Sequence, residues 1–367
     1  MSLDATAIPA RPVGAGRYVL ELAGALGRRD DVDLTVVTRR RDGARWPAIG
    51  AAGVVERAPT SRPARLVWEQ VALPRLIGEL GADVHHAPHY TMPERSRVPT
   101  VVTIHDMTFF DHPEWHERTK APLFRRAIRV AAERADALVC VSAMTSERLR
   151  ARLDPRARVE VIPHGVDHAL FRAQASPDDE DVLGSLEVTR PYVAFLGTLE
   201  PRKDVPTLVA AFDRIAVREP ALSLVIAGLD GWGTRAVHDA ISQARCRDRI
   251  RRVGYVPDSA VPALFRHAAA VAYPSLDEGF GLPVLEALAC GAAVVTTQGT
   301  AMAEVSGDAA LLVPPGHADA LAQSLAALVA GGADIDGLRR RGPDVASAYT
   351  WEASAAAHTQ LYRSVRR

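Results

Sequence analysis

Apolar and polar residues alternate along the chain in a way that predicts strands and helices in regular succession. Short apolar runs are followed by longer stretches whose apolar positions recur every three or four residues. The runs that predict strands are 2–4, 32–37, 84–88, 100–104, 137–141, 159–162, 192–196, 223–227, 251–256, 269–273, 293–297 and 310–313. The stretches that predict helices are 18–26, 66–80, 119–135, 143–153, 206–217, 235–244, 260–267, 283–291, 318–329 and 351–365.

This succession predicts an α/β protein with two doubly wound, Rossmann-like domains built on parallel sheets. A length of 367 residues also favours two domains. Residues 176–181 are acidic and contain proline, as is typical of a linker or loop. We therefore expect domains at 1–170 and 171–348, followed by a terminal helix within 349–367 that has no strand partner. Ligands of such sheets bind beyond the carboxyl ends of the strands, which makes a cleft between the domains the expected site.

Composition and charge exclude some classes of function. The chain is 48% hydrophobic and 24% charged, which are globular values, and it lacks an apolar run of ~18 residues that could cross a bilayer. Residues 1–175 carry 26 Lys and Arg against 21 Asp and Glu, which favours contact of this half with an anionic surface or substrate. No basic stripe with interleaved aromatic residues is present, so nucleic acid binding is not indicated.

The cysteines and the first residues of the chain indicate the cellular compartment of the protein. Cys140, Cys246 and Cys290 lack the spacing of metal ligands, and the apolar surroundings of Cys140 and Cys290 predict buried, inert thiols. The first residues lack the basic start and apolar middle of a signal peptide. We therefore expect a location in the reducing cytosol. The predicted first strand is short, which leaves open whether the chain begins further upstream.

The stretch 269–293 carries the strongest chemical signal. An apolar strand is followed by a loop with Glu278, then by Gly279 and Gly281, and then by a helix that contains Glu286. Glycines at a helix start allow backbone N–H groups to approach phosphate or sugar oxygens. Glu286 lies five residues beyond Gly281, about 7.5 Å along a helix, where a carboxylate could accept hydrogen bonds from the hydroxyls of a ribose.

A second signal follows the strand 192–196, where Arg202 and Lys203 stand together. The chain has only two lysines, Lys120 and Lys203, against 42 arginines. The use of a lysine at this point favours a role in binding a diphosphate, for which a compact ammonium group on a flexible side chain is suited. The alternative is that Lys203 lies in a solvated turn.

No pattern in the sequence predicts a metal site. Two D-x-D strings occur, at 31–33 and 179–181, but one begins a strand and the other lies in the predicted linker. The histidines lack a helical i,i+4 pair or a cysteine companion. We expect no metal cofactor.

The strings GAGRY, TIHDMTFFDHPEW, VSAMT, VIPHGVD, GTLEPRK and EGFGLPVLEALACG occur in this order. Together they resemble the retaining glycosyltransferases of family four, over nearly the whole chain. The resemblance implies the GT-B fold, in which two Rossmann-like domains face each other across a cleft and the terminal helix crosses back to the first domain. The strings are most similar to those of the mannosyltransferase-type branch, which builds polysaccharides and surface glycans.

The resemblance also implies roles for individual residues. Glu278 would face the transferred sugar and Glu286 the ribose, while Arg202 and Lys203 would neutralise the departing diphosphate. Many relatives have an arginine where this chain has Thr198, which increases the dependence on those two cations. The catalytic positions implied are His105, Arg202, Lys203 and Glu278. The donor-binding positions implied are Gly14, Gly16, Val256, Asp258, Phe280, Gly281, Leu282 and Glu286.

The function expected from the resemblance is transfer of a hexose, with mannose from GDP-mannose favoured, to a glycan or lipid-linked acceptor without a metal. The base, the acceptor and the linkage stay open. One alternative is another nucleotide-sugar enzyme of the same fold, such as an epimerase or phosphorylase. The glutamate pair disfavours an epimerase, and neither lysine is placed to carry a phosphorylase's pyridoxal group. The other alternative is a non-catalytic nucleotide-sugar-binding protein.

The helix 119–135 raises the question of a membrane. It carries Lys120, Arg125, Arg126 and Arg129 beside an apolar face that includes Phe124. Such a helix could rest on an anionic leaflet and bring a lipid-linked acceptor to the site, which would place the protein at the inner face of the membrane. The favoured alternative is that its apolar side packs on the sheet while its arginines are solvated.

Overall fold

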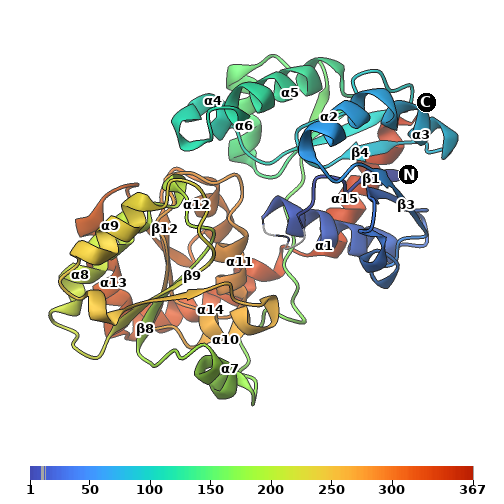
Figure 1. Ribbon diagram of the computed structural model, residues 1–367. Coiled ribbons are helices and arrows are strands. Elements are labelled where there is room, and N and C mark those ends of the chain that lie inside the picture. Colours follow the sequence, from blue (N-terminus) through green and yellow to red (C-terminus); the bar gives the residue numbers. More distant parts are fainter. Residues whose placement is uncertain (10–11, 13, 367) are drawn as a thin grey trace. The chain divides into compact units, whose positions relative to one another are not determined.

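The computed structural model describes residues 1–9, 12 and 14–366 and contains two compact units, each built on a parallel sheet (Figure 1). The first unit comprises Met1–Gly165 and Thr350–Arg367, and the second comprises Val166–Tyr349. The predicted fold class, two α/β domains with parallel sheets, is confirmed. The units divide after Gly165 and Tyr349, where the sequence predicted boundaries after residues 170 and 348.

The sheet of the first unit has the strand order β3-β2-β1-β4-β5-β6-β7. Its inner strands β5 and β6 are buried at every position, as expected where helices cover both faces of a parallel sheet. The edge strand β3 is half-exposed and was not predicted. The strands are β1 Ser2–Asp4, β2 Thr35–Arg39, β3 Gly53–Ala58, β4 His85–Ala87, β5 Thr100–Ile104, β6 Ala137–Cys140 and β7 Arg158–Val161.

Helices flank this sheet. The single helix predicted at 66–80 is instead two, α2 and α3, because Pro74 lacks the N–H that would continue α2 through Ala72. The helices are α1 Ala15–Gly27, α2 Arg62–Val71, α3 Leu73–Glu79, α4 Thr108–Asp111, α5 Lys120–Arg134, α6 Ala143–Arg152 and α15 Trp351–Val365.

The sheet of the second unit has the order β10-β9-β8-β11-β12-β13. Its strands are β8 Tyr192–Leu196, β9 Ser223–Ala227, β10 Ile250–Gly254, β11 Ala270–Tyr273, β12 Val294–Thr297 and β13 Ala310–Val313. Its helices are α7 Asp179–Ser185, α8 Val205–Ala216, α9 Arg235–Gln243, α10 Val261–Arg266, α11 Leu282–Ala289, α12 Ala301–Ser306, α13 Ala318–Ala330 and α14 Ala333–Ser347.

The linker predicted at 176–181 is wrong, because its acidic residues begin helix α7. Carboxylates are favourable in the first turn of a helix, where they meet the positive end of its dipole. Asp179 is buried and accepts from Arg266 at 2.6 Å, and its other oxygen lies 2.9 Å from His267 Nε2. Asp179 therefore has a structural role in the second unit.

The terminal helix α15 packs against α1 and completes the core of the first unit (Figure 1). The Tyr18 hydroxyl of α1 lies 3.0 Å from both Thr103 Oγ1 and His358 Nε2. Further along α15, the Tyr362 hydroxyl lies 2.8 Å from His86 Nδ1. These bonds satisfy buried polar groups of β4 and β5, so residues from the end of the chain belong to the interior of its first unit.

Candidate active site

Each sheet has one point at which the order of strands reverses, and ligands of open parallel sheets bind beyond the carboxyl ends of the strands there. In the first unit this point lies between β1 and β4, and in the second between β8 and β11. The loops and helix starts that follow three of these strands, β1, β8 and β11, carry nine of the twelve predicted site residues.

In the second unit the loops after β8 and β11 are joined by their backbones and by charge. Leu276 N donates to the carbonyl of Arg202 at 2.8 Å. The side chains of Arg202 and Lys203 each bind one carboxylate oxygen of Glu278. We call these three residues the Glu278 cluster. Lys203 Nζ also donates to the Tyr273 hydroxyl at 3.1 Å, so the end of β11 helps to fix the ammonium group.

Burial and charge oppose each other at Glu278. Its side chain is only 10% exposed, and burial alone would raise the pKa of the carboxyl, but Arg202 and Lys203 outweigh burial and lower it to about 2. Burial lowers the pKa of Lys203, but the charge of Glu278 reverses that effect and raises it. All three groups are therefore charged at neutral pH. Arg202 also pairs with Glu200 at 2.8 Å, so two carboxylates balance the two cations, and a diphosphate would take over contacts that these carboxylates now make.

Helix α11 begins directly after this cluster. Gly281, its N-cap, has φ of +102°, and an added Cβ would lie 2.6 Å from the Met302 side chain, so the turn requires glycine. Phe280 packs in the second unit with its ring centroid 6.0 Å from that of Tyr349. Leu282 is the first residue of α11, where backbone N–H groups lack earlier helical partners. Glu286 lies in the next turn and is 2% exposed.

The loop after β10 carries the last two residues of the second unit that were predicted to bind the donor. Val256 is buried, at 4% exposure, whereas Asp258 is exposed and begins a short 3-10 turn. Tyr255, which the sequence analysis did not single out, is 42% exposed beside them. A flat base would therefore meet the Tyr255 side chain more readily than that of Val256.

In the first unit a pocket of about 220 Å³ lies at the reversal between β1 and β4. Gly14 caps α1 with φ of +51°, and Gly16 lies in its first turn, where an added Cβ would come within 3.3 Å of Pro12. Val13, which directly precedes Gly14, lies outside the described residues. The pocket is lined by Asp4, Ile8, Gly16, Pro88 and His89 among others.

His105 follows β5 and is half-buried. Its Nε2 lies 2.8 Å from the carbonyl oxygen of Pro88, and because a carbonyl only accepts, Nε2 carries the proton. Burial lowers the pKa of His105, so the ring is neutral near pH 7 and its Nδ1 keeps a lone pair. The residue can therefore accept a hydrogen bond from a hydroxyl of a ligand.

His89 was not among the predicted site residues, yet it lies beside His105, with 5.9 Å between ring centroids, and in the pocket with Gly16. Burial and the neighbouring His105 lower the pKa of His89 to about 3, so it too is neutral. Its position after the predicted strand 84–88 was an available signal, because carboxyl ends of parallel strands share one edge of a sheet. Asp4, at the end of β1, carries the same signal.

Metal ligands, cysteines and membrane-spanning helices were also considered in the sequence. Among the described residues, no group of three or more His, Cys, Asp or Glu side chains is placed to hold a metal ion. Cys140, Cys246 and Cys290 are buried, as predicted for the first and last. Within residues 1–9, 12 and 14–366, every helix is too short or too polar to cross a bilayer.

Two family models match the chain. Residues 12–170 match the model described as Glycosyltransferase Family 4, and residues 180–341 match the one described as Glycosyl transferases group 1. The chain is 30% identical to the D-inositol 3-phosphate glycosyltransferase of Actinosynnema mirum, over 84% of this chain and 83% of that protein. It is 28% identical to the O-antigen chain mannosyltransferase B of Escherichia coli, over 73% of this chain and 71% of that protein.

Solved structures show the same two-domain fold. Sucrose-phosphate synthase from Thermosynechococcus elongatus superposes with a TM-score of 0.81 at 22% identity, over 99% of this chain and 98% of that one. Anabaena HepE in complex with UDP and glucose superposes with a TM-score of 0.78 at 21% identity, over 99% of both chains. At these identities the likeness concerns the fold.

Proposed function

This chain belongs to glycosyltransferase family 4, and from that premise we propose that it transfers mannose from GDP-mannose to a glycan or glycolipid acceptor with retention of configuration. The observation that carries the proposal is the Glu278 cluster. Its two cations and one carboxylate converge at the carboxyl ends of β8 and β11, where a sheet of this order binds its ligand.

In the proposed reaction the diphosphate leaves the sugar and its growing charge is met by Arg202, Lys203 and the backbone N–H groups at the start of α11. The bond between the anomeric carbon and the diphosphate oxygen breaks, and the acceptor oxygen bonds to that carbon from the same face. The acceptor's proton passes to the departing phosphate oxygen. The catalytic positions would thus stabilise charge and orient the sugar.

The state of Glu278 supports a reaction without a covalent intermediate on this residue. A carboxylate that acts as nucleophile or base needs available lone pairs and a suitable pKa. Each oxygen of Glu278 binds one cation and keeps a lone pair for a hydroxyl, but its pKa of about 2 makes it a weak base and a weak nucleophile. We propose that Glu278 instead holds hydroxyls of the transferred sugar, while Glu286 binds the ribose.

Besides Gly14 and Gly16, which stay the proposed donor contacts of the first unit, this unit would supply the acceptor side. His105 offers a lone pair at Nδ1, and the pocket beside it is lined by His89 and Asp4. Neutral imidazoles and a carboxylate suit the hydroxyls of a sugar acceptor. Support for mannose as the transferred sugar comes from the similarity to a mannosyltransferase that acts on O-antigen chains.

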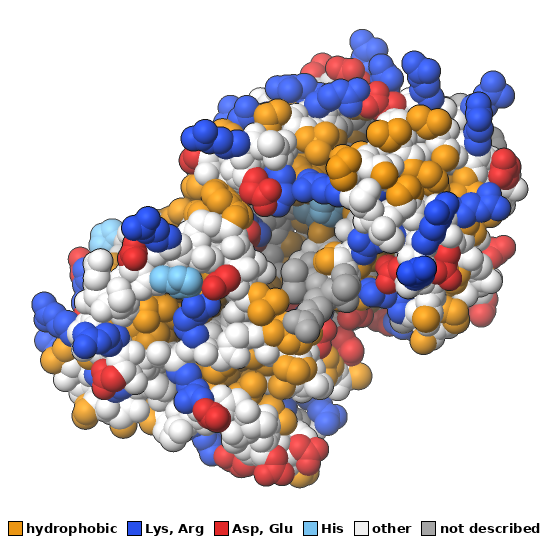
Figure 2. Space-filling view, viewed as in Figure 1, with side chains coloured by type: hydrophobic (Ala, Val, Ile, Leu, Met, Phe, Trp, Pro, Cys, Tyr) orange, Lys and Arg blue, Asp and Glu red, His pale blue; other side chains and the backbone are white. Residues whose placement is uncertain are grey.

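A lipid-linked acceptor would bring the enzyme to a membrane, and α5 was the candidate contact, although packing of this helix on the sheet was the favoured prediction. Figure 2 shows Lys and Arg side chains on the surface of the first unit, but several of those on α5 have partners within the unit. Arg126 binds Glu94 at 2.6 Å, Arg125 donates to the carbonyl of Phe109 at 2.6 Å, and the apolar side of α5 is buried. This arrangement favours packing of α5 on the sheet over contact with a membrane.

A screen of donors tests the proposal. The melting temperature of the protein would be measured with GDP-mannose and with UDP-, ADP- and dTDP-sugars, since a ligand that binds the folded state raises it. We expect the largest rise with GDP-mannose and release of GDP when a mannose-terminated acceptor is added. A rise with UDP-glucose instead would contradict the donor, and no rise with any donor would contradict the proposed function itself.

A further inference from the structure

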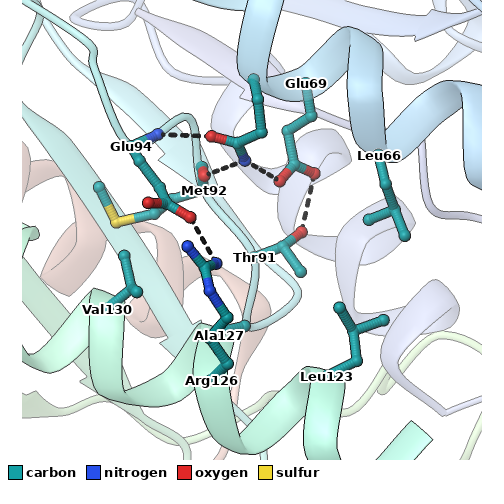
Figure 3. Close-up of a pocket in the computed structure, with 10 residues that line it drawn as sticks. Leu66, Glu69, Thr91, Met92, Glu94, Leu123, Arg126, Ala127 and Val130 are labelled. Carbon is teal, nitrogen blue, oxygen red and sulfur yellow. Dashed lines mark hydrogen bonds and ion pairs between the residues drawn. The ribbon is translucent and has the colours of Figure 1, made fainter. Parts of the chain in front are cut away.

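A second pocket of the first unit, of about 110 Å³, lies between α2, α5 and the segment after β4 (Figure 3). We call it the α2–α5 pocket. Leu66 projects into it from α2, and Leu123 and Val130 from α5, so these walls are apolar. Polar side chains, Glu69, Gln70 and Glu94, form its remaining side.

The polar side is electrically balanced. Glu94 pairs with Arg126 at 2.6 Å, and Glu69 pairs with Arg65 at 3.1 Å. Thr91 Oγ1 donates to Glu69 at 2.8 Å, and these bonds fix the carboxylate at the pocket wall (Figure 3). Each carboxylate and arginine that lines the pocket already has a partner, and Arg134, outside the lining, lies 3.7 Å from Glu94 as a second cation, so the walls themselves do not require a charged ligand. A neutral molecule with hydroxyls on its rim and C–H groups on its faces matches both sides, and a pyranose ring has that form.

The α2–α5 pocket adjoins the pocket that contains His89. Pro88 and His89 line the latter, and Thr91 and Met92 line the former. Residues two apart in a chain are at most about 7 Å apart, since consecutive Cα atoms are separated by ~3.8 Å. Successive rings of a glycan are joined by a single oxygen atom, so two neighbouring rings of one acceptor can occupy two sites this close.

Side chains also connect the two pockets. Glu69 of the α2–α5 pocket holds Arg65, whose Nη1 donates to Thr6 Oγ1 at 3.2 Å. Thr6 N in turn donates to Asp4 Oδ1 at 2.8 Å, and Asp4 lines the pocket that contains His89. One hydrogen-bonded network therefore joins residues that line the two pockets.

We propose that the α2–α5 pocket binds the second sugar of the acceptor, counted from the ring that receives the transferred sugar. The inference rests on the proposed function and adds to it an acceptor of at least two sugar rings. Glu69 is 1% exposed and its oxygens already accept from Arg65, Gln70 and Thr91, so it holds the polar side of the pocket in place behind the groups that would meet the sugar.

Paired glycosides test the proposal. Affinities would be measured by calorimetry for methyl mannoside, glucoside and galactoside and for the corresponding methyl biosides. We expect at least one bioside to bind about tenfold more tightly than its monosaccharide, a difference of about 1.4 kcal/mol. Leu66→Trp should fill the pocket and bring this ratio near one. Val67→Trp is the matched control, because Val67 is the next residue on α2, is 64% exposed and should leave the ratio unchanged.

Leu123→Trp fills the same pocket from α5 and serves if Leu66→Trp does not melt cooperatively. Equal affinity for every pair in the native protein would overturn the proposal, as would a ratio that both Trp variants preserve. Binding of GDP-mannose without acceptor would be measured in the same samples. In the native protein, absence of any bioside preference together with intact donor binding would refute only this inference, whereas absent donor binding would refute the proposed function.

Discussion

The ring of Tyr18 meets the ring of His105 edge-on, with 5.2 Å between centroids and 82° between planes. The Tyr18 hydroxyl is held by Thr103 on β5 and by His358 on α15. One aromatic side chain thus joins the predicted catalytic histidine to the terminal helix of the chain. The position of His105 depends on packing from both ends of the sequence.

Replacing Tyr18 separates packing from hydrogen bonding. Tyr18→Phe keeps the ring beside His105 but leaves buried partners of its hydroxyl unsatisfied, so the free energy of unfolding should fall by about 1–3 kcal/mol with little change in turnover. Tyr18→Ala should also lower turnover, because His105 loses its support. Urea titration and release of GDP measure the two effects. Normal turnover by a folded Tyr18→Ala would show that this contact does not position His105.

Lys203 should affect both stability and reaction, and a double variant distinguishes them. Lys203→Met leaves the buried Glu278 with one cation fewer, which should destabilise the fold, and should lower turnover by about 100-fold or more. Lys203→Met with Glu278→Gln removes both charges and should recover stability while activity stays low. Unfolding curves and turnover of the two variants provide the comparison. Recovery of activity together with stability would make the role of Lys203 purely structural.

Glu286→Gln should weaken binding of the nucleotide by about 1.5–3 kcal/mol, because a charge-assisted bond to the ribose is lost. Calorimetric titration with GDP measures the change. Glu352→Gln is the control, since Glu352 lies on the surface of α15, paired with Arg28, in the first unit. Unchanged affinity for GDP in a folded Glu286→Gln would place this residue outside the nucleotide site.

Stability should depend on pH through Glu69, whose pKa is raised by burial and by Asp4 from an ordinary 4.5 to about 7. The folded carboxyl keeps its proton up to about pH 7, whereas the unfolded one loses it near pH 4.5. The contribution of Glu69 to stability is therefore full below pH 4.5 and falls by about 3 kcal/mol as pH rises to about 7. Unfolding free energies of the native protein and Glu69→Gln should diverge over this window. Parallel profiles would contradict the raised pKa.

Activity should persist in EDTA, because the charge of the diphosphate is met by Arg202, Lys203 and the amides of α11. Turnover before and after chelation, with Mg²⁺ and Mn²⁺ restored separately, tests this. Complete loss that a metal restores would contradict the prediction. Asp179 would not explain such a result, because Arg266 and His267 already bind its carboxylate.

The sequence predicts a strand or helix well when the element's own residues form a clear apolar pattern. The strand 100–104 has the predicted bounds, because every residue of β5 is buried and apolar or β-branched. Strand β3 was missed because it lies at the edge of the sheet and exposes Glu56 and Arg57. Helix α7 was missed because Asp179, in its acidic start, is buried through Arg266 and His267, partners 87 and 88 residues away. Distant contacts of this kind leave no local pattern.

The same limit applies to the site. The importance of Arg202, Lys203 and Glu278 could be predicted from their motifs, but their pairing could not. It depends on β8 and β11 being neighbours in the sheet, and strand order does not follow from the pattern along the chain. The α2–α5 pocket likewise could not be predicted, because residues of α2, α5 and the segment after β4 line it together and these are far apart in the sequence.

The contribution of α15 to the first unit has a consequence for synthesis on the ribosome. Domains generally fold as units while the chain emerges, beginning at the N-terminus. Here the first unit lacks α15 until residues 351–365 are made, whereas Val166–Tyr349 is continuous and is complete sooner. The second unit can therefore reach its final form first. Until α15 has been made, Tyr18 and His86 lack their partners on it, so a nascent chain stalled before residue 350 would hold an unfinished first unit.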